Sequence, residues 1–316
     1  MYDLIIIGGG PAGLTAAVYA VRKRMEVLMI SKDLGGKTNF RLQLPWVERH
    51  QIINGEEVVS RFANEIDYLS SVRLLDKVEK VEKLPDGVFR LRTRGEETFE
   101  ACALLIATGA RGQLLNVPGE REYMMRGLCY SAMSYAPVMI DRNVVVIGEG
   151  ELALKAVGEL AKVAAHVTLV AAEHGELDTP MGKTARALSN VLILEGYQVV
   201  EVLGDHVHRY ARAMVVTNGT DTRELSMDAG FVELALLPNV QMVRGLVELD
   251  ANDRIRIDAK NRTSCPGIFA AGDVTDVYAE QVLIAVGEGA KAALSAYDYL
   301  LAHPAKEKVA VKTEWR

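Results

Sequence analysis

The feature that most restricts the fold of this 316-residue chain is a glycine-rich turn close to its beginning. The turn at residues 8–13 reads GGGPAG, follows a short apolar run at 2–7 and precedes a helical pattern at 14–24. A second apolar run at 26–30 completes a strand, helix and strand within about 30 residues, the context in which this spacing forms a dinucleotide-binding unit. An ordinary glycine-rich turn is the alternative, and the flanking strands argue against it.

The three spaced glycines have separate roles in such a unit. Gly8 permits the tight turn, Gly10 lets the backbone approach a pyrophosphate, and Gly13 lets the helix pack closely on the strand. The free N–H groups of the helix N-terminus then face the phosphates. Ser31 stands where an acidic residue for the ribose is usual, and its hydroxyl can still donate and accept a hydrogen bond.

The same unit recurs later in the chain. An apolar run at 144–147 leads into GEGELA at 148–153, a helical pattern to about 164 and a further apolar run at 166–170. The duplication predicts an α/β protein with two Rossmann-like (three-layer ββα) dinucleotide-binding domains. Further helices are expected at 55–70 and 281–303, and strands at 72–82, 88–93 and 103–106.

Composition excludes several classes of protein. The net charge of −6 argues against a general nucleic-acid binder, and we expect no nucleic-acid partner. No apolar run reaches the length of about 18 residues that a membrane span needs, so we expect a cytoplasmic protein without a membrane partner. The three cysteines, Cys102, Cys129 and Cys265, form neither a disulfide framework nor a CxxC pair.

A series of short motifs in a fixed order gives the chain a more specific likeness. GGK at 35–37, ATGA at 107–110, NVPGE at 116–120, GDV at 272–274 and Gln281 follow the first turn in that order. With the two glycine turns, they make the chain resemble the low-molecular-weight thioredoxin reductase family of FAD enzymes. The resemblance implies an FAD-binding domain built from residues 1–117 and 246–316, an inserted NAD(P)H-binding-like domain at 118–245, and a homodimer.

The first glycine turn and the resemblance together imply the residues that contact the cofactor. Asp273 would contact the ribityl–phosphate region, or would instead cap the following helix. Gln281 and Val282 would lie near the flavin ring. The full set of expected FAD contacts is Gly8, Gly10, Pro11, Ala12, Gly13, Ser31, Lys32, Gly36, Lys37, Thr38, Ala107, Gly109, Gly272, Asp273, Gln281 and Val282.

The chain departs from the family at its redox-active CxxC. That site falls on residues 131–134, so Ser131 and Ser134 replace both cysteines. Hydroxyl groups cannot cycle between dithiol and disulfide. Ser131, Ser134 and Tyr130 are therefore candidate flavin-facing neighbours without redox chemistry of their own. Cys129 is either a small core residue or a thiol capable of sulfenate or mixed-disulfide chemistry.

A second departure concerns NADPH. The family's basic cluster HRRxxxR, which binds the 2′-phosphate, corresponds here to a stretch beginning Ala171-Ala172-Glu173, so the guanidinium donors are missing. Glu149 and Glu151 lie at the second glycine turn, where they repel a phosphate. We expect NADPH to bind poorly and NADH to be opposed slightly less.

Together these features predict an FAD-containing, thioredoxin-reductase-like oxidoreductase that exchanges electrons with ferredoxin, another redox protein or a small acceptor. A non-catalytic FAD-binding regulatory protein is the alternative, and a thioredoxin reductase that uses Cys129 is disfavoured. Trp315 is a candidate cover for the flavin or part of a frayed terminus. Trp46 is a further candidate neighbour of the flavin, and His50 and His174 are expected to be solvated.

Overall fold

The computed structural model describes residues 1–47, 55–68, 72–205, 207 and 209–304. The chain divides into two compact units. The first unit comprises Met1–Asn39, Asn54–Ala110 and Pro238–Arg316, and the second comprises Phe40–Ile53 and Arg111–Leu237. The two units meet along the chain at 110/111 and 237/238, close to the expected boundaries at 117/118 and 245/246, and the described residues 40–47 group with the second unit.

The first unit is built on a seven-stranded sheet in the order β3-β2-β1-β6-β5-β4, with β17 paired to β6. All pairs of β1, β2, β3, β6 and β17 are parallel, whereas the β4–β5 hairpin joins β6 in antiparallel fashion. The strands are β1 (Tyr2–Ile7), β2 (Val27–Ser31), β3 (Arg73–Leu75), β4 (Val78–Lys83), β5 (Phe89–Thr93), β6 (Thr98–Ile106) and β17 (Ile268–Ala270).

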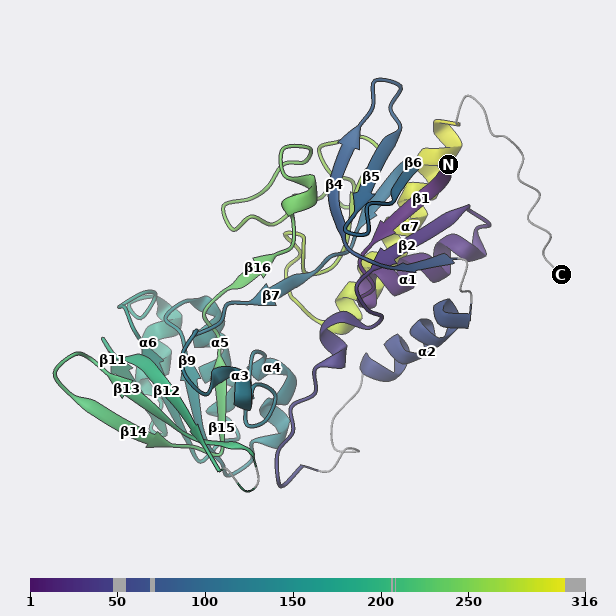
Figure 1. The fold of residues 1–316 in the computed structure, drawn as a ribbon. Helices are drawn as coiled ribbons and strands as arrows, with labels where there is room; N and C mark the ends of the chain where they lie inside the picture. The colour runs from purple at the N-terminus through teal and green to yellow at the C-terminus, as the bar shows by residue number, and fades with distance from the viewer. Residues whose placement is uncertain (48–54, 69–71, 206, 208, 305–316) are drawn as a thin grey trace. The chain divides into compact units, whose positions relative to one another are not determined.

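Alternate residues of β1 face two different cores, as expected of a strand buried on both sides. Leu4 and Ile6 pack with the helices, whereas Ile5 and Ile7 pack with the β4–β5 hairpin and the segment around Val243. The helices are α1 (Pro11–Arg22), α2 (Gly55–Tyr68) and α7 (Val282–Ala302), and α1 and α7 lie beside β1 (Figure 1). The parallel strands thus have the helices on one face, and on the other face a core that they share with the β4–β5 hairpin and the segment around Val243.

The second unit repeats the strand, glycine turn and helix on a five-stranded parallel sheet in the order β11-β10-β9-β15-β8. A separate antiparallel sheet of three strands packs beside it. The elements are β8 (Leu128–Cys129), β9 (Asn143–Ile147), β10 (His166–Ala171), β11 (Val191–Glu195), β12 (Gln198–Gly204), β13 (Ala211–Thr217), β14 (Thr222–Ser226), β15 (Ala229–Val232), α3 (Glu120–Tyr123), α4 (Ala132–Tyr135), α5 (Glu151–Leu160) and α6 (Pro180–Ala187).

Two short strands carry the chain between the units. β7 (Ala110–Gly112) and β16 (Leu236–Pro238) pair with each other where the chain leaves the first unit and returns to it. Among the residues described, none of the helices combines the length and the apolar character that a membrane crossing needs.

The predicted fold class is confirmed, and most predicted elements are present with shifted ends. The helix expected at 14–24 begins at Pro11, a residue that suits the first helical position because its missing N–H is not needed there. The strand expected at 72–82 is two strands, β3 and β4, that pair with different neighbours. The helix predicted to reach 164 ends at Leu160.

Two glycines of α7 provide a test of the close packing between α7 and α1. A Cβ at Gly289 would lie 2.1 Å from the carbonyl oxygen of Ala12, whereas a Cβ at Gly287 meets nothing within 4 Å. We expect Gly289→Ala to destabilise the protein by about 1–3 kcal/mol through overpacking. Gly287→Ala should be neutral or stabilising by about 0.5–1 kcal/mol, because alanine is the better helix former. Denaturant unfolding of both variants measures this, and equal stabilities would contradict the described packing.

Candidate functional site

The glycine turn at residues 8–13 lies at the carboxyl edge of the first sheet. Gly8 has a φ of 113°, and a Cβ there would lie 2.3 Å from the carbonyl oxygen of Ala107. A Cβ at Gly13 would lie 1.9 Å from the carbonyl oxygen of Gly8. A Cβ at Gly10, in contrast, meets nothing within 4 Å. The protein's own packing requires the outer two glycines, and the middle one faces open space.

The helix that follows this turn begins without a side-chain cap. Gly10 is the N-cap of α1, Pro11 follows it, and the first turn of the helix contains no acidic residue. The N-terminal N–H groups of α1 are therefore not neutralised by a local carboxylate. Uncapped N–H groups beside an open glycine form the usual binding site for a phosphate.

The segment after β2 forms a second wall of this site. A Cβ at Gly36 would lie 3.1 Å from Cα of Gly10, so the two backbones are in close contact. The amide of Gly36 donates to Oδ1 of Asp33 at 3.0 Å, and the hydroxyl of Thr38 donates to the carbonyl of Gly35 at 2.8 Å. These bonds hold a short 3₁₀ turn over residues 36–39 against the glycine turn.

The segment after β17 forms a third wall. A Cβ at Gly272 would lie 3.2 Å from Cβ of Ala12, in the first turn of α1. The next residue, Asp273, places Oδ2 2.5 Å from Nζ of Lys37. The alternative role of Asp273 as a helix cap is wrong, because the next helix, α7, has Gln281 as its N-cap and begins at Val282. The carboxylate is instead part of an ion pair beside the glycine turn.

The loop at 107–109 is positioned by a residue that the sequence analysis missed. Asn239 donates from Nδ2 to the carbonyls of Thr108 and Gly109 at 3.0 and 3.2 Å. The backbone carbonyl of Asn239 accepts a hydrogen bond from the Thr108 hydroxyl at 2.7 Å. Asn239 lies directly after Pro238, where the chain re-enters the first unit, and no local sequence pattern indicates its role. It fixes the loop that carries Ala107 and Gly109.

Ser31 offers an unused hydroxyl at the end of β2. Its side chain is buried, with 5% exposure, and its Oγ has no hydrogen-bond partner among the residues described. A Cβ at Gly9 would lie 2.6 Å from this oxygen. Lys32, which follows, is exposed. A buried hydroxyl without a partner, next to a phosphate-binding turn, suits the ribose of a dinucleotide. The residues present therefore fit an FAD-type dinucleotide.

The corresponding edge of the second unit is acidic. Four neighbouring parallel strands, β11, β10, β9 and β15, each end in or are closely followed by a glutamate. In strand order these residues are Glu195, Glu173, Glu149 and Glu233. Ligands of open α/β sheets bind outside the carboxyl ends of the strands. An anionic ligand would therefore approach a row of carboxylates.

Glu149 occupies the second glycine turn most directly. Its side chain accepts a hydrogen bond from the Ala172 backbone, and its Oε2 is buried without a partner among the described residues. Burial, with a smaller contribution from the nearby charge of Glu173, raises the pKa of Glu149. The side chain thus reaches from the end of β9 towards the end of β10, at the carboxyl edge of the sheet.

His174 has partners that the sequence did not reveal. Its Nδ1 lies 2.5 Å from Oε1 of Glu195, and its Nε2 lies 3.0 Å from Oδ2 of Asp178. Hydrogen bonds to Glu195 and then to Asp178 raise the pKa of His174. Arg186 donates to the second oxygen of Glu195 at 2.7 Å. These basic side chains of the second unit are already engaged with carboxylates.

The two serines at the expected CxxC position do meet. Oγ of Ser131 lies 2.8 Å from Oγ of Ser134, and the intervening Ala132 amide donates to the buried carboxylate of Glu233 at 2.5 Å. The hydroxyl of Tyr130 donates to Oε1 of Glu120 at 2.6 Å. The three candidate flavin-facing residues thus have hydrogen bonds within the second unit.

Cys129 and Trp46 are also packed inside the second unit. The thiol of Cys129 is 1% exposed, and burial raises its pKa to about 12. Nε1 of Trp46 donates to the carbonyl of Val138 at 3.3 Å, and Arg142 lies 4.4 Å from the centre of the indole ring. Trp315 and His50 lie outside the described residues.

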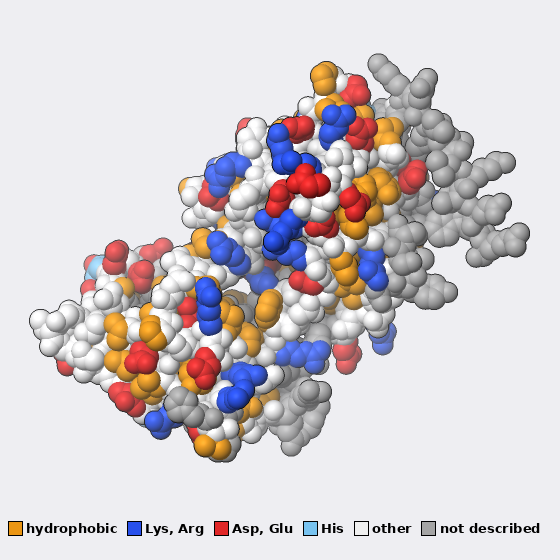
Figure 2. All heavy atoms as spheres, viewed as in Figure 1, with side chains coloured by type: hydrophobic (Ala, Val, Ile, Leu, Met, Phe, Trp, Pro, Cys, Tyr) orange, Lys and Arg blue, Asp and Glu red, His pale blue; other side chains and the backbone are white. Residues whose placement is uncertain are grey.

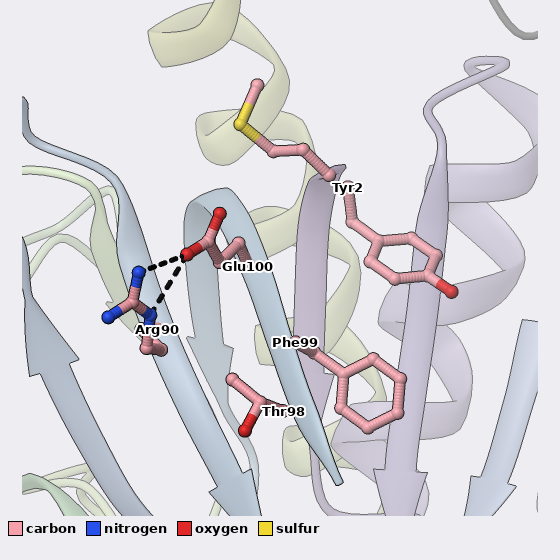
Figure 3. A pocket seen from close by; sticks show the side chains of 6 residues that line it. Tyr2, Arg90, Thr98, Phe99 and Glu100 are labelled. Atoms are coloured by element: carbon pink, nitrogen blue, oxygen red, sulfur yellow. Dashed lines mark hydrogen bonds and ion pairs between the residues drawn. The ribbon is translucent and has the colours of Figure 1, made fainter.

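A shallow pocket of the first unit lies away from the glycine turn. It is lined by Tyr2, Thr98, Phe99 and an Arg90–Glu100 pair in which Nε and Nη2 donate to one carboxylate oxygen at 2.9 and 2.7 Å (Figure 3). Tyr2 and Thr98 begin β1 and β6, so the pocket lies at the amino ends of these parallel strands. It is therefore at the opposite end of the sheet from the first glycine turn.

The fold and this site define the class of protein. Residues 2–289 match the model of the family described as pyridine nucleotide-disulphide oxidoreductase, so the chain belongs to that family of flavin-binding oxidoreductases.

Particular relatives have names and structures to compare. The chain is 34% identical over 303 residues to the F subunit of alkyl hydroperoxide reductase from Pseudomonas putida, covering 95% of this chain and 58% of that protein. It is 33% identical to the corresponding protein of Xanthomonas campestris, covering 95% of this chain and 57% of that protein. It thus spans less than two thirds of these relatives. The thioredoxin reductase of Streptococcus pyogenes matches 96% of this chain and 99% of its own with a TM-score of 0.84 and 30% identity.

The thiol of Cys129 provides a test of the described burial. Near pH 8, a pKa of about 12 leaves about a thousandfold less thiolate than the ordinary value of 9.0. We expect iodoacetamide to alkylate Cys129 much more slowly than the half-buried Cys265, as measured by peptide mass spectrometry over time. In denaturant the two rates should become similar. Rapid alkylation of Cys129 in the native protein would show that the thiol is accessible. It would then favour the alternative that Cys129 carries out sulfenate or mixed-disulfide chemistry.

Proposed function

We propose that the first unit binds FAD and that the protein is a flavin-dependent oxidoreductase whose electron donor is not NADPH. It exchanges electrons with a protein donor such as ferredoxin, or with a small acceptor. The observation that carries this proposal is the row of four glutamates at the carboxyl ends of β11, β10, β9 and β15, in which Glu149 of the second glycine turn lies beside Glu173. We also propose a homodimer in the cytoplasm, as the resemblance implies.

The acidic edge opposes a nicotinamide dinucleotide by charge and by volume. At about 5 Å and an effective dielectric of about 20, one carboxylate repels one phosphate charge by about 3 kcal/mol before screening by salt. That is equivalent to about two orders of magnitude in affinity. Protonation of Glu149 would remove its charge and leave its side chain in the crevice. The basic groups nearby, His174 and Arg186, are already paired with carboxylates.

The second unit contains no dithiol to carry electrons onwards among its described residues. Ser131 and Ser134 cannot form a disulfide, and Cys129 is a buried single thiol. When bound, FAD supplies hydride and one-electron transfer. The chain's own contribution would be to hold the pyrophosphate at Gly10 and α1, to hold the ribose at Ser31, and to exclude a nicotinamide through Glu149.

We propose a redox protein or a small acceptor as the partner because the second unit lacks a dithiol among its described residues and has an acidic edge. A charged surface patch is not part of this argument. Figure 2 shows basic and acidic side chains interspersed over the face in view. The name of one relative, the F subunit of alkyl hydroperoxide reductase, suggests an alkyl hydroperoxide as one class of small acceptor. The second candidate is a non-catalytic FAD-binding regulatory protein, which the hydrogen-bonded serine pair and the buried Cys129 favour.

An anaerobic titration of the FAD-loaded protein tests the proposal. NADPH, NADH and reduced ferredoxin are added separately, and bleaching of the visible flavin band is followed. We expect bleaching by ferredoxin and none by NADPH at comparable concentrations. Rapid bleaching by NADPH would overturn the role assigned to the acidic edge. No response to any of the three would favour the non-catalytic candidate.

Removing the two carboxylates should partly restore nucleotide binding. We expect the double variant Glu149→Gln with Glu173→Gln to bind NADH at least about tenfold more tightly than the wild type at low ionic strength, because two repulsions are lost. Isothermal titration calorimetry measures the affinity. Glu201→Gln, an exposed carboxylate of β12 in the other sheet of this unit, is the matched control and should change nothing. Equal affinities for all three proteins would contradict the electrostatic argument.

A further inference from the structure

The ion pair of Lys37 and Asp273 joins two of the walls that surround the first glycine turn. Nζ of Lys37 lies 2.5 Å from Oδ2 of Asp273, with side-chain exposures of 48% and 14%. A charged ammonium group thus lies next to a carboxylate that is mostly shielded from solvent.

The backbone contacts place this ion pair at the phosphate-binding end of the site. Gly36, which precedes Lys37, contacts Gly10, and Gly272, which precedes Asp273, contacts Ala12. Gly10 and Ala12 flank the start of α1. The two charged residues therefore approach the uncapped N-terminus of α1 from two segments that are distant in sequence. Their pairing links these segments over the glycine turn.

The charges around the turn explain why a cation is useful there. The dinucleotide pyrophosphate is dianionic, and a carboxylate close to it is repelled unless a positive charge intervenes. Asp33, the other acidic residue of these walls, accepts the Gly36 amide at 3.0 Å. Lys37 faces Asp273 directly and can neutralise it. An ammonium group acts as a point charge and can contact a carboxylate and a phosphate together.

We propose that Lys37 is an electrostatic latch for the dinucleotide pyrophosphate, with its ammonium group shared between Asp273 and the phosphates. A glutamine at this position could donate a hydrogen bond but could not balance the charges. This inference rests on the proposed function, since it requires FAD in the first unit. The ammonium group of Lys37 would make the affinity for FAD depend on ionic strength more strongly than a neutral side chain at this position would.

The test is the binding of FAD and of ADP to the FAD-free full-length protein, measured by calorimetry at low and high salt. ADP carries the phosphates and adenosine of the ligand and has no flavin ring. We expect Lys37→Gln to weaken both ligands by about tenfold at low ionic strength and by less at high salt. Lys80→Gln is the matched control, because Lys80 pairs with Glu82 on β4 of the same unit and should leave both affinities unchanged.

A double-mutant cycle separates the latch from a merely structural role. In an Asp273→Asn background, Lys37→Gln should weaken FAD binding less than it does in the wild type, because no carboxylate remains to be neutralised. Circular dichroism and thermal unfolding show whether each variant keeps its fold. Equal losses in both backgrounds would overturn the shared-charge role.

The remaining outcomes distinguish this inference from the proposed function. If the wild type binds neither FAD nor ADP, the proposed function fails and the latch fails with it. If the wild type binds both and Lys37→Gln binds them equally well with the same salt dependence, the latch alone is overturned. A loss confined to FAD, with ADP unaffected, would place Lys37 at the flavin end and would also overturn it.

Discussion

The close approach of α1 to the backbone on both of its sides is the constraint on which the first unit depends. On one side, a Cβ at Gly13 would lie 1.9 Å from the Gly8 carbonyl oxygen, and on the other a Cβ at Gly289 would lie 2.1 Å from that of Ala12. Neither distance leaves room for a side chain. The helix is therefore fixed in position, and its uncapped N-terminus points at a defined place on the edge of the sheet. The position of the free N–H groups at this edge follows from the packing of α1.

The chain uses this geometry twice with opposite charge. In the first unit, the space in front of Gly10 is open and Lys37 brings a positive charge beside it. In the second unit, Gly150 is equally open, but Glu149 precedes it in the turn and Glu151 follows it, and the carboxyl group of Glu149 lies near Ala172 and Glu173 beyond the end of β10. Burial opposes the ionised form of this carboxyl group. Because its pKa is raised in the folded state, the stability that it contributes is present at low pH and is lost as the pH rises through that pKa.

The sequence was sufficient for features that local patterns determine. Glycine spacing, apolar runs and their order predicted the α/β fold class and both strand, glycine turn and helix units. It was insufficient where distant segments meet. Nothing near Lys37 in the sequence indicates its pairing with Asp273, because the segments after β2 and β17 meet only in the folded protein. Nothing near His174 indicates its pairing with Glu195, because β10 and β11 become neighbours only in the sheet. Asn239 was missed for the same reason, because it contacts the loop at 107–109 from a segment that is distant in the sequence.

The side chains near the expected CxxC position of the second unit offer no thiol relay for electrons. A thiol whose pKa is raised to about 12 has almost no thiolate at neutral pH, and two hydroxyls hydrogen-bonded to each other offer no electron carrier. Tyr130 is held by Glu120. In the proposed function, electrons would therefore have to enter and leave through the flavin itself. A flavin that exchanges electrons directly with both partners must be held firmly by the protein, and it needs no relay of thiols. The charge-balanced pyrophosphate site proposed for the first unit would meet that need.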